Sequence, residues 1–336
     1  MTTLWDTTGT HVVKALAAER RTGGAVTSGM ALTLVVVVDQ EDVDGAEEAA
    51  TLASSIHPMR MLMVIRRQID APVPRLDAEV TIGGRLGPGE AVVLRMYGRL
   101  SLHAESVTLP LLAPDAPVVT WWYGQPPEKI AYDPLGVFAE RRITNVAQSE
   151  DPNAALQQRA EDFAPGDTDL AWTRLTPWRA ALASAFDGAR RHKPTAATVR
   201  GGNNAPSARL LAGWLSARLD IDATVEGTDD ELINQVEIEF ANGKTTTATL
   251  EGTSLVLRRE GQQDSYQPFG ERALGELLAE ELRRLDHDHV YAEALAQVTG
   301  VTGIEDRSPV RQHIWWDPAT GKEGKQKESK EPKESA

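Results

Sequence analysis

Hydrophobic runs and helical patterns alternate in the first part of the chain. Residues 31–39, ALTLVVVVD, form a valine-rich run that is typical of a strand buried on both faces. Apolar residues then recur at helical spacing after Asp44, which can cap the helix, and Glu47 is placed to complete a capping box. Pro58 follows this helix, and 59–67, MRMLMVIRR, have the pattern of a second strand. Because a strand, a helix and a strand joined in this way pack with a right-handed crossover, we expect the two strands to be parallel.

The same kind of alternation continues to about residue 187. A Gly/Pro turn between two apolar runs predicts a hairpin of strands at 76–82 and 90–97. The other expected elements are a short helix near 101–112, a strand at 118–124, a helix at 153–163, an extended segment at 169–175, and a helix that Thr176 caps with Pro177 in its first position. We therefore expect an N-terminal α/β sandwich with a mainly parallel sheet over residues 1–190.

The pattern changes after ARRHKPT at 189–195, which we interpret as a domain boundary. A strand at 195–201 and a helix at 208–219 precede three successive strands, and Asn242-Gly243 between the first two indicates a type I′ hairpin. Two further helices are expected, at 271–285 and up to about 298. These elements predict a smaller α+β domain with antiparallel hairpin strands at 195–316, followed by a charged low-complexity tail at 322–336 that we expect to be disordered.

Composition narrows the classes of function. The chain has 336 residues, 41% hydrophobic and 25% charged, as in ordinary globular proteins, and a net charge of −14. This acidity argues against nucleic acid or an anionic membrane as a main partner. The absence of cysteine excludes disulfides, thiolate nucleophiles and Cys-ligated metals. We find no signal peptide, and the longest apolar run is too short to span a bilayer, so we expect a cytoplasmic protein.

Motifs for catalysis or cofactor binding are not found. The sequence QEDVDG at 40–45, after the first buried strand, lacks the glycine spacing of a dinucleotide site, and its acidic residues would repel a pyrophosphate. Gly243-Lys244-Thr245 resembles the end of a phosphate loop but lies in the expected hairpin. The cluster at 286–289, DHDH, could hold a metal, but residues two apart on a helix point in different directions, and Asp288 fits better as a helix cap. We predict no catalytic residue, no metal and no cofactor.

Basic residues gather around the expected boundary of this acidic chain. They are Arg174, Arg179, Arg190, Arg191, His192, Lys193 and Arg200, followed directly by Gly201-Gly202 and a helix start. Arg190, Arg191, Lys193 and Arg200 could bind an anion such as a sugar phosphate, with help from the amides of the helix start. The segment could equally contact an acidic protein surface, or be a solvated loop between domains.

The aromatic residues fall into two groups. Trp178 and Trp214 lie among apolar residues at helical spacing, which favours core positions. Trp121, Trp122 and Tyr123 are consecutive at a strand end, and neighbouring strand residues alternate between faces. We therefore expect at least one of these three near a sheet edge or loop, where aromatics often anchor interfaces. The pair at 315–316 would either pack back on the core or contact a partner.

Three segments together resemble a known family. They are VVTWWYGQPPE at 118–128, RRITNVA at 141–147 and DLAWTRLTPWRAALASAFD at 169–187, of which the pattern W-T-R-L-x-P-W-R is the most specific. From about its first strand to its last helix, the chain resembles the OpcA family, the glucose-6-phosphate dehydrogenase assembly proteins. Its alanine- and arginine-rich composition suits the actinobacterial branch.

The resemblance implies a non-catalytic partner that promotes assembly of glucose-6-phosphate dehydrogenase, the entry enzyme of the oxidative pentose phosphate pathway, and activates it allosterically. Cyanobacterial relatives are linked to thioredoxin control through cysteines, a switch that this cysteine-free chain cannot contain.

The signature residues Trp172, Arg174, Trp178 and Arg179 would either hold the domain junction or contact the dehydrogenase, because tryptophan and arginine dominate interface energetics. The alternative function is a sugar-phosphate-binding enzyme or sensor that uses the basic segment at 174–200.

Overall fold

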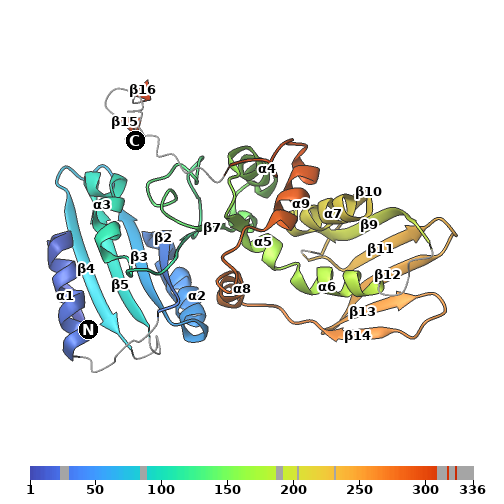
Figure 1. Cartoon of the computed structure of the whole chain (residues 1–336), viewed down its shortest axis with the longest axis horizontal. Coiled ribbons are helices and arrows are strands. Elements are labelled where there is room, and N and C mark those ends of the chain that lie inside the picture. Colours follow the sequence, from blue (N-terminus) through green and yellow to red (C-terminus); the bar gives the residue numbers. More distant parts are fainter. Residues whose placement is uncertain are drawn as a thin grey trace, which may run out of the picture.

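Two β-sheets lie side by side in the computed structural model, with helices packed on and between them (Figure 1). The structure describes residues 1–22, 30–83, 89–186, 192–202, 204–230 and 232–308, together with the backbone at 316–317 and 322–323. Within these residues, no helix combines the length and the apolar composition that a membrane crossing needs.

The first sheet has eight described strands and is mainly parallel. The strands are β1 (Thr2–Leu4), β2 (Leu32–Asp39), β3 (Met59–Arg67), β4 (Arg75–Ile82), β5 (Glu90–Tyr97), β6 (Val118–Trp122), β7 (Arg141–Thr144) and β8 (Asp167–Asp169), in the order β1-β4-β5-β3-β2-β6-β7-β8. Only β4 runs antiparallel to its neighbours β1 and β5. The predicted parallel sheet is confirmed, as is the hairpin of β4 and β5.

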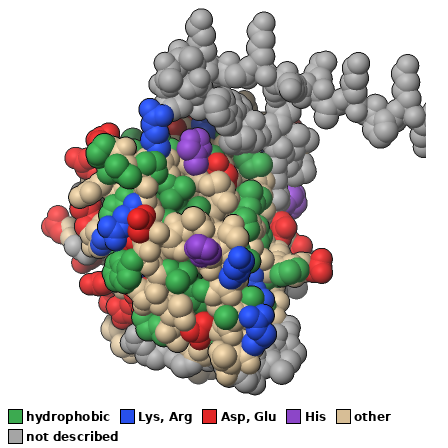
Figure 2. Space-filling model, turned by 90° about the vertical axis from the view of Figure 1, so that its left-hand side faces the viewer, with side chains coloured by type: hydrophobic (Ala, Val, Ile, Leu, Met, Phe, Trp, Pro, Cys, Tyr) green, Lys and Arg blue, Asp and Glu red, His purple; other side chains and the backbone are tan. Residues whose placement is uncertain are grey.

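Both faces of the first sheet are covered by helices, which explains the uninterrupted valine run of β2. On one face, α1 (Gly9–Thr22) and α3 (Glu105–Thr108) pack against Val35 and Val37. On the other, α2 (Val43–Ile56) and α8 (Leu274–Glu281) pack against Leu34 and Val36. Figure 2 shows the face of this unit that lies on the left in Figure 1, where hydrophobic, acidic and basic side chains are interspersed.

Two local predictions about the first unit are wrong. The capping box at Asp44 and Glu47 does not form, because a 3₁₀ turn, η1 (Gln40–Asp42), leads straight into α2 without a side-chain cap. The helix expected near 101–112 is divided into η3 (Gly98–Leu102), α3 and η4 (Leu109–Leu111). Pro110 lies within the last of these and has no N–H to continue a longer helix.

The second sheet has six described strands and is mainly antiparallel. They are β9 (Pro194–Gly202), β10 (Asp222–Thr228), β11 (Gln235–Phe240), β12 (Thr245–Glu251), β13 (Ser254–Arg259) and β14 (Ser265–Pro268), in the order β10-β9-β11-β12-β13-β14. The hairpin at Asn242-Gly243 is confirmed, but its turn is not type I′, because Gly243 has a positive φ of 78° whereas Asn242 does not. Strands β10, which is parallel to β9, and β14 were not expected from the sequence.

Helices cover one face of this second sheet. These are α6 (Thr176–Ala185), α7 (Pro206–Leu219) and α9 (His289–Thr299), which share a hydrophobic core with β9, β11, β12 and β13. The predicted α+β arrangement is therefore present. Asp288 caps α9 through a hydrogen bond from the Tyr291 N–H, as the sequence indicated.

The chain crosses between the sheets more than once. α4 (Pro152–Asp162) and the turn η5 (Val146–Gln148) follow β7, and α6 then packs on the second sheet although it precedes residue 190. α8 returns from the second sheet to pack on α2. The division into 1–190 and 195–316 therefore stays a prediction about folding units. Of the tail at 322–336, only Lys322–Glu323 is described, as β16 paired with β15 (Trp316–Asp317); the rest lies outside the described residues.

Candidate functional site at the junction of the sheets

The signature segment forms two short helices in succession between the sheets. Asp169, at the end of β8, caps α5 (Leu170–Thr173) by accepting a hydrogen bond from the Ala171 N–H at 2.8 Å. Its other oxygen accepts from the Thr144 hydroxyl at 2.6 Å and from the Val146 N–H at 2.9 Å. The extended conformation expected at 169–175 is thus wrong, because this buried cap starts a helical turn directly after the strand.

The next helix begins one residue earlier than predicted. Leu175 is the N-cap of α6, so Thr176 and Pro177 are its first two residues. The Thr176 hydroxyl does not cap the helix but donates to Oε1 of Glu280 in α8, at 2.6 Å. The residue thus connects two helices that lie far apart in the sequence.

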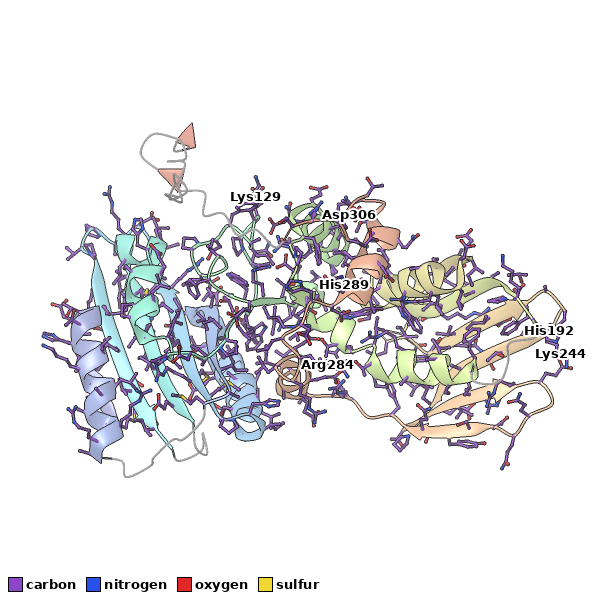
Figure 3. All side chains as sticks on the ribbon, viewed as in Figure 1. Lys129, His192, Lys244, Arg284, His289 and Asp306 are labelled. Carbon is purple, nitrogen blue, oxygen red and sulfur yellow. The ribbon has the colours of Figure 1, made fainter. Side chains whose placement is uncertain are left out.

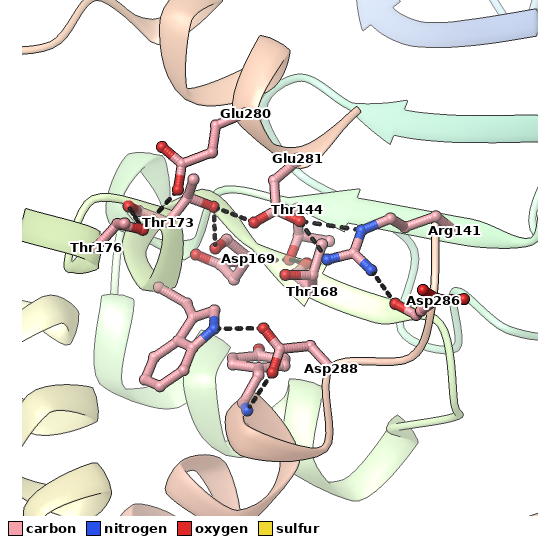
Figure 4. Close-up of polar contacts among 12 residues, drawn as sticks. Arg141, Thr144, Thr168, Asp169, Thr173, Thr176, Glu280, Glu281, Asp286 and Asp288 are labelled. Atoms are coloured by element: carbon pink, nitrogen blue, oxygen red, sulfur yellow. Dashed lines mark hydrogen bonds and ion pairs between the residues drawn. The ribbon is translucent and has the colours of Figure 1, made fainter. Parts of the chain in front are cut away.

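Trp172 is the centre of this junction. It is fully buried, and its indole N–H donates to Oδ2 of Asp288 at 2.8 Å (Figure 4). The Arg179 guanidinium lies 3.7 Å from the centre of the Trp172 ring, and the Tyr291 ring centre is 5.8 Å away. Burial lowers the pKa of Arg179, while Asp288, Glu281 and Glu280 act in the opposite direction. The arginine is held by a ring face and by nearby carboxylates.

α8 is connected to this centre by buried polar contacts. Oε1 of Glu281 accepts from the Thr173 hydroxyl at 2.6 Å, and Oε2 pairs with the Arg141 guanidinium from β7 (Figure 4). Arg141 also donates to the backbone carbonyl of Asp286 at 2.7 Å. Because both charged groups are buried and well hydrogen-bonded, removing either one would leave its partner uncompensated.

A second set of buried charges lies beside β8. Arg142 pairs with Asp167 and donates to the carbonyls of Ala139 and Pro165. Nearby, Asp162 accepts from the Ile130 N–H at 2.5 Å. Burial, and then the negative charge of Asp167, raise the pKa of Asp162 to about 7.

A cavity of about 620 Å³ lies beside these contacts and is lined by residues from before and after the predicted domain boundary at 189–195. Its lining residues come from the start of α4, the α5–α6 segment, the start of α7, the β10–β11 connection and the segment between β14 and α8. The signature residues Arg174, Leu175, Pro177 and Trp178 form one wall. The Trp178 side chain is 2% exposed, which confirms its predicted core position, and its ring packs against Phe269.

Of the aromatic triplet at the end of β6, Tyr123 alone meets the expectation of a residue near a sheet edge or loop. Trp121 and Trp122 are both fully buried, on opposite faces, because β6 lies inside a sheet that helices cover on both sides. Tyr123 is half-buried after the strand end, with its ring edge-on to Trp121 and its hydroxyl against Gly45 of α2. Of the three, only Tyr123 has surface left for a partner.

Among the predicted basic residues that the structure describes, Lys193 and Arg200 do not lie in one site. Arg190 and Arg191 lie outside the described residues, so their role stays a prediction. Lys193 directly precedes β9 and Arg200 lies near its other end, so an extended segment of about 23 Å separates them. Arg200 is already paired with Glu226 and Glu237. Figure 3 shows His192, next to Lys193, at the end of the second sheet away from the junction, near Lys244.

Sequence reasoning missed the acidic half of the junction. Glu280 and Glu281 lie in an ordinary leucine-rich helix, and no local pattern indicates that they accept from Thr176 and Thr173, about a hundred residues earlier. Arg141 lies in RRITNVA, one of the three segments that resemble the OpcA family. This resemblance was the one sequence signal that pointed to a residue on this side of the junction.

Comparison with known proteins places these residues in a family. Two family models, described as the N-terminal and the C-terminal domain of a glucose-6-phosphate dehydrogenase subunit, match residues 50–161 and 165–295. The chain belongs to the OpcA family. An OpcA relative from Synechocystis, described as a putative OxPP cycle protein, is 26% identical over 196 residues, which cover 53% of this chain and 40% of the relative. The chain thus matches less than half of that protein's length. The actinobacterial assignment stays a prediction.

Solved structures that are similar to this OpcA chain include oxidoreductases. One from Sinorhizobium meliloti gives a TM-score of 0.47 at 9% identity and covers 81% of this chain and 96% of its own. An inositol dehydrogenase homologue from Azotobacter vinelandii gives 0.36 at 9% identity, with coverage of 84% and 91%. Likenesses this weak carry no argument about activity.

Proposed function

We propose that this OpcA chain is a non-catalytic cytoplasmic partner of glucose-6-phosphate dehydrogenase that promotes its assembly and activates it allosterically. The observation that carries the proposal is the match of both family domains, each described as part of a dehydrogenase subunit, to adjacent parts of one chain. The buried junction supports it, because contacts of Trp172, Arg179 and Arg141 join elements that pack on different sheets, so surfaces of both sheets would be presented to a partner as one piece.

The activation follows from differential binding. If the chain binds the assembled, substrate-competent dehydrogenase more tightly than the free subunits, it shifts the population toward the assembled form. A difference in binding free energy of about 1–3 kcal/mol changes the ratio of the two states by about 5- to 150-fold. By reciprocity, glucose 6-phosphate must tighten the complex by the same factor by which the complex tightens substrate binding.

The test is co-purification of the full chain with its cognate dehydrogenase, followed by activity measurements across substrate concentrations. We expect a stable complex by light scattering, and a change in KM or kcat that saturates with added chain. An unrelated acidic protein of similar size is the control for non-specific effects. The proposal is wrong if no complex forms, or if the complex has the same activity and the same affinity with and without glucose 6-phosphate.

A further inference from the structure

The junction cavity has the form of a ligand site. Its volume of about 620 Å³ falls within the range of about 300–1,000 Å³ that is usual for small-molecule pockets. The inner wall is apolar, formed by Leu175, Trp178, Ile233 and Phe269, and the rings of Trp178 and Phe269 meet edge to face with centres 6.0 Å apart. Such a wall suits the carbon body of a ligand, including a sugar ring face.

Arg174 supplies an uncompensated charge to this cavity. Its side chain is half-buried, and within the described part of the chain it makes no hydrogen bond or ion pair. The nearest charges are Glu271 and Arg272, which act in opposite directions, and Arg272 is itself paired with Glu280. Burial lowers the pKa of Arg174, as expected for a cation without a counterion. An anion bound here would gain charge-assisted hydrogen bonds that no described side chain provides.

The start of α7 lies in the same wall. Its N-cap is Ala205, whose side chain cannot accept a hydrogen bond, and Pro206 occupies the first turn. α7 has 14 residues, so its N-terminus carries the partial positive charge of a full helix dipole. Pro206 has no N–H, and the Ala208 N–H donates to the Ala205 carbonyl. Ser207 is therefore the first residue of the helix with a backbone donor for the cavity. This feature adds to Arg174 and to the apolar wall, and would not indicate a ligand without them.

Acidic residues at the rim limit the charge of the ligand. Asp229, Asp230 and Glu271 also line the cavity, but they are exposed, so water and salt screen them more than the half-buried Arg174. They would disfavour a ligand with several negative charges, such as a nucleoside triphosphate. The arrangement favours one carboxylate or phosphate group on a compact carbon body.

We propose that the junction cavity binds a small organic phosphate ester, with its phosphate at Arg174 and the start of α7 and its carbon body against Trp178 and Phe269. The ligand site thus lies at Arg174, away from Lys193 and Arg200. Because this binding is a property of the isolated chain, it stands or falls separately from the partnership with the dehydrogenase.

The test is calorimetric titration of the isolated full chain with glucose 6-phosphate, phenyl phosphate and glucose. We expect saturable binding of at least one phosphate ester and none of glucose. Arg174→Gln should weaken the binding by about 10- to 100-fold, the usual loss for a charge-assisted hydrogen bond. Arg200→Gln is the matched control, because its arginine is already paired with carboxylates, and it should bind as the wild type does.

A second pair of variants keeps the test decisive if the Arg174→Gln variant does not fold. Leu232 is at the cavity and 46% exposed, so a charge there should be tolerated. Leu232→Lys should strengthen and Leu232→Glu should weaken binding of the same phosphate ester. The absence of binding for both phosphate esters at millimolar concentration would overturn the proposal. So would equal binding by the wild type and a folded Arg174→Gln, or equal binding by the two Leu232 variants.

Discussion

At the scale of single residues, the family signature is mainly a set of internal contacts. Trp172 donates to Asp288, lies under Arg179 and packs near Tyr291, all within the junction. Asp288 is shared, because it also caps α9. The tryptophan therefore connects α5 to the start of α9 through a single carboxylate.

This contact can be tested by Trp172→Phe. The substitution keeps an aromatic ring under Arg179 but removes the N–H that donates to a charged carboxylate, so we expect a loss of about 2 kcal/mol in the free energy of unfolding. Urea unfolding measures it as a lower midpoint with an unchanged m-value. Trp5→Phe is the matched control, since Trp5 is 67% exposed and should change little. Equal midpoints for the two variants would show that the buried N–H contributes nothing.

The raised pKa of Asp162 makes stability depend on pH. An unfolded chain ionises this carboxyl near pH 4, whereas the folded chain holds the proton up to about pH 7. The folded state therefore binds more protons between about pH 4 and pH 7, and the free energy of unfolding falls as pH rises through that window. The neighbouring charges are Asp167, which opposes ionisation, and Arg159, which favours it.

Asp162→Asn should remove this dependence. The amide oxygen can still accept from the Ile130 N–H, and the variant should exceed the wild type in stability by up to about 4 kcal/mol at pH 8, with little advantage at pH 4. Urea unfolding at a series of pH values gives the comparison. Glu161→Gln, an exposed change in the same helix, should leave the pH profile as it is. An Asp162→Asn profile parallel to that of the wild type would contradict the assigned pKa.

At the scale of elements, α8 is the helix that ties the sheets together. It packs on α2 of the first unit and receives hydrogen bonds from Thr173 and Thr176. The close approach of the two helices depends on Gly275, where an added Cβ would lie 2.6 Å from the carbonyl oxygen of Ala49 and 2.8 Å from Cβ of Leu52. Only a residue without a side chain fits this distance.

Gly275→Ala should therefore destabilise the chain although alanine is the better helix former. We expect a net loss of about 1–3 kcal/mol, because the clash involves backbone that cannot move without separating the helices. Gly270→Ala is the control, since an added Cβ at Gly270 meets nothing within 4 Å. Thermal unfolding of both variants compares them directly. A Gly275→Ala chain as stable as the control would mean that α8 does not pack tightly on α2.

At the scale of the whole molecule, the spacing of hydrophobic residues predicted one mainly parallel and one antiparallel sheet. It did not predict how the two sheets are joined. The valine run of β2 and the Asn-Gly turn after β11 are local signals, and both proved reliable. Three other features depend on contacts between residues that are distant in the sequence, and such contacts leave no local pattern. They are the short helix α5, the burial of Trp122 and the path of α8.

The residues of the candidate site were likewise predicted only in part. Trp178 was placed in the core from its helical spacing, and Arg174 was named from the resemblance. The cavity beside them also needs the β10–β11 connection and the segment between β14 and α8, which come from later in the chain. Lys193 and Arg200 were grouped because they are close in sequence, but an extended strand separates them.

The return of α8 to the first sheet also restricts how such chains can diverge. The C-terminal family segment, 165–295, contains α8, while the second half of α2 lies in the N-terminal segment, 50–161. Recombination between two relatives at the boundary of these two segments would pair α8 of one relative with α2 of the other. The close contact at Gly275 would then no longer be between helices that evolved together. The two segments must therefore be inherited as a matched pair, and neither can be exchanged as an independent cassette.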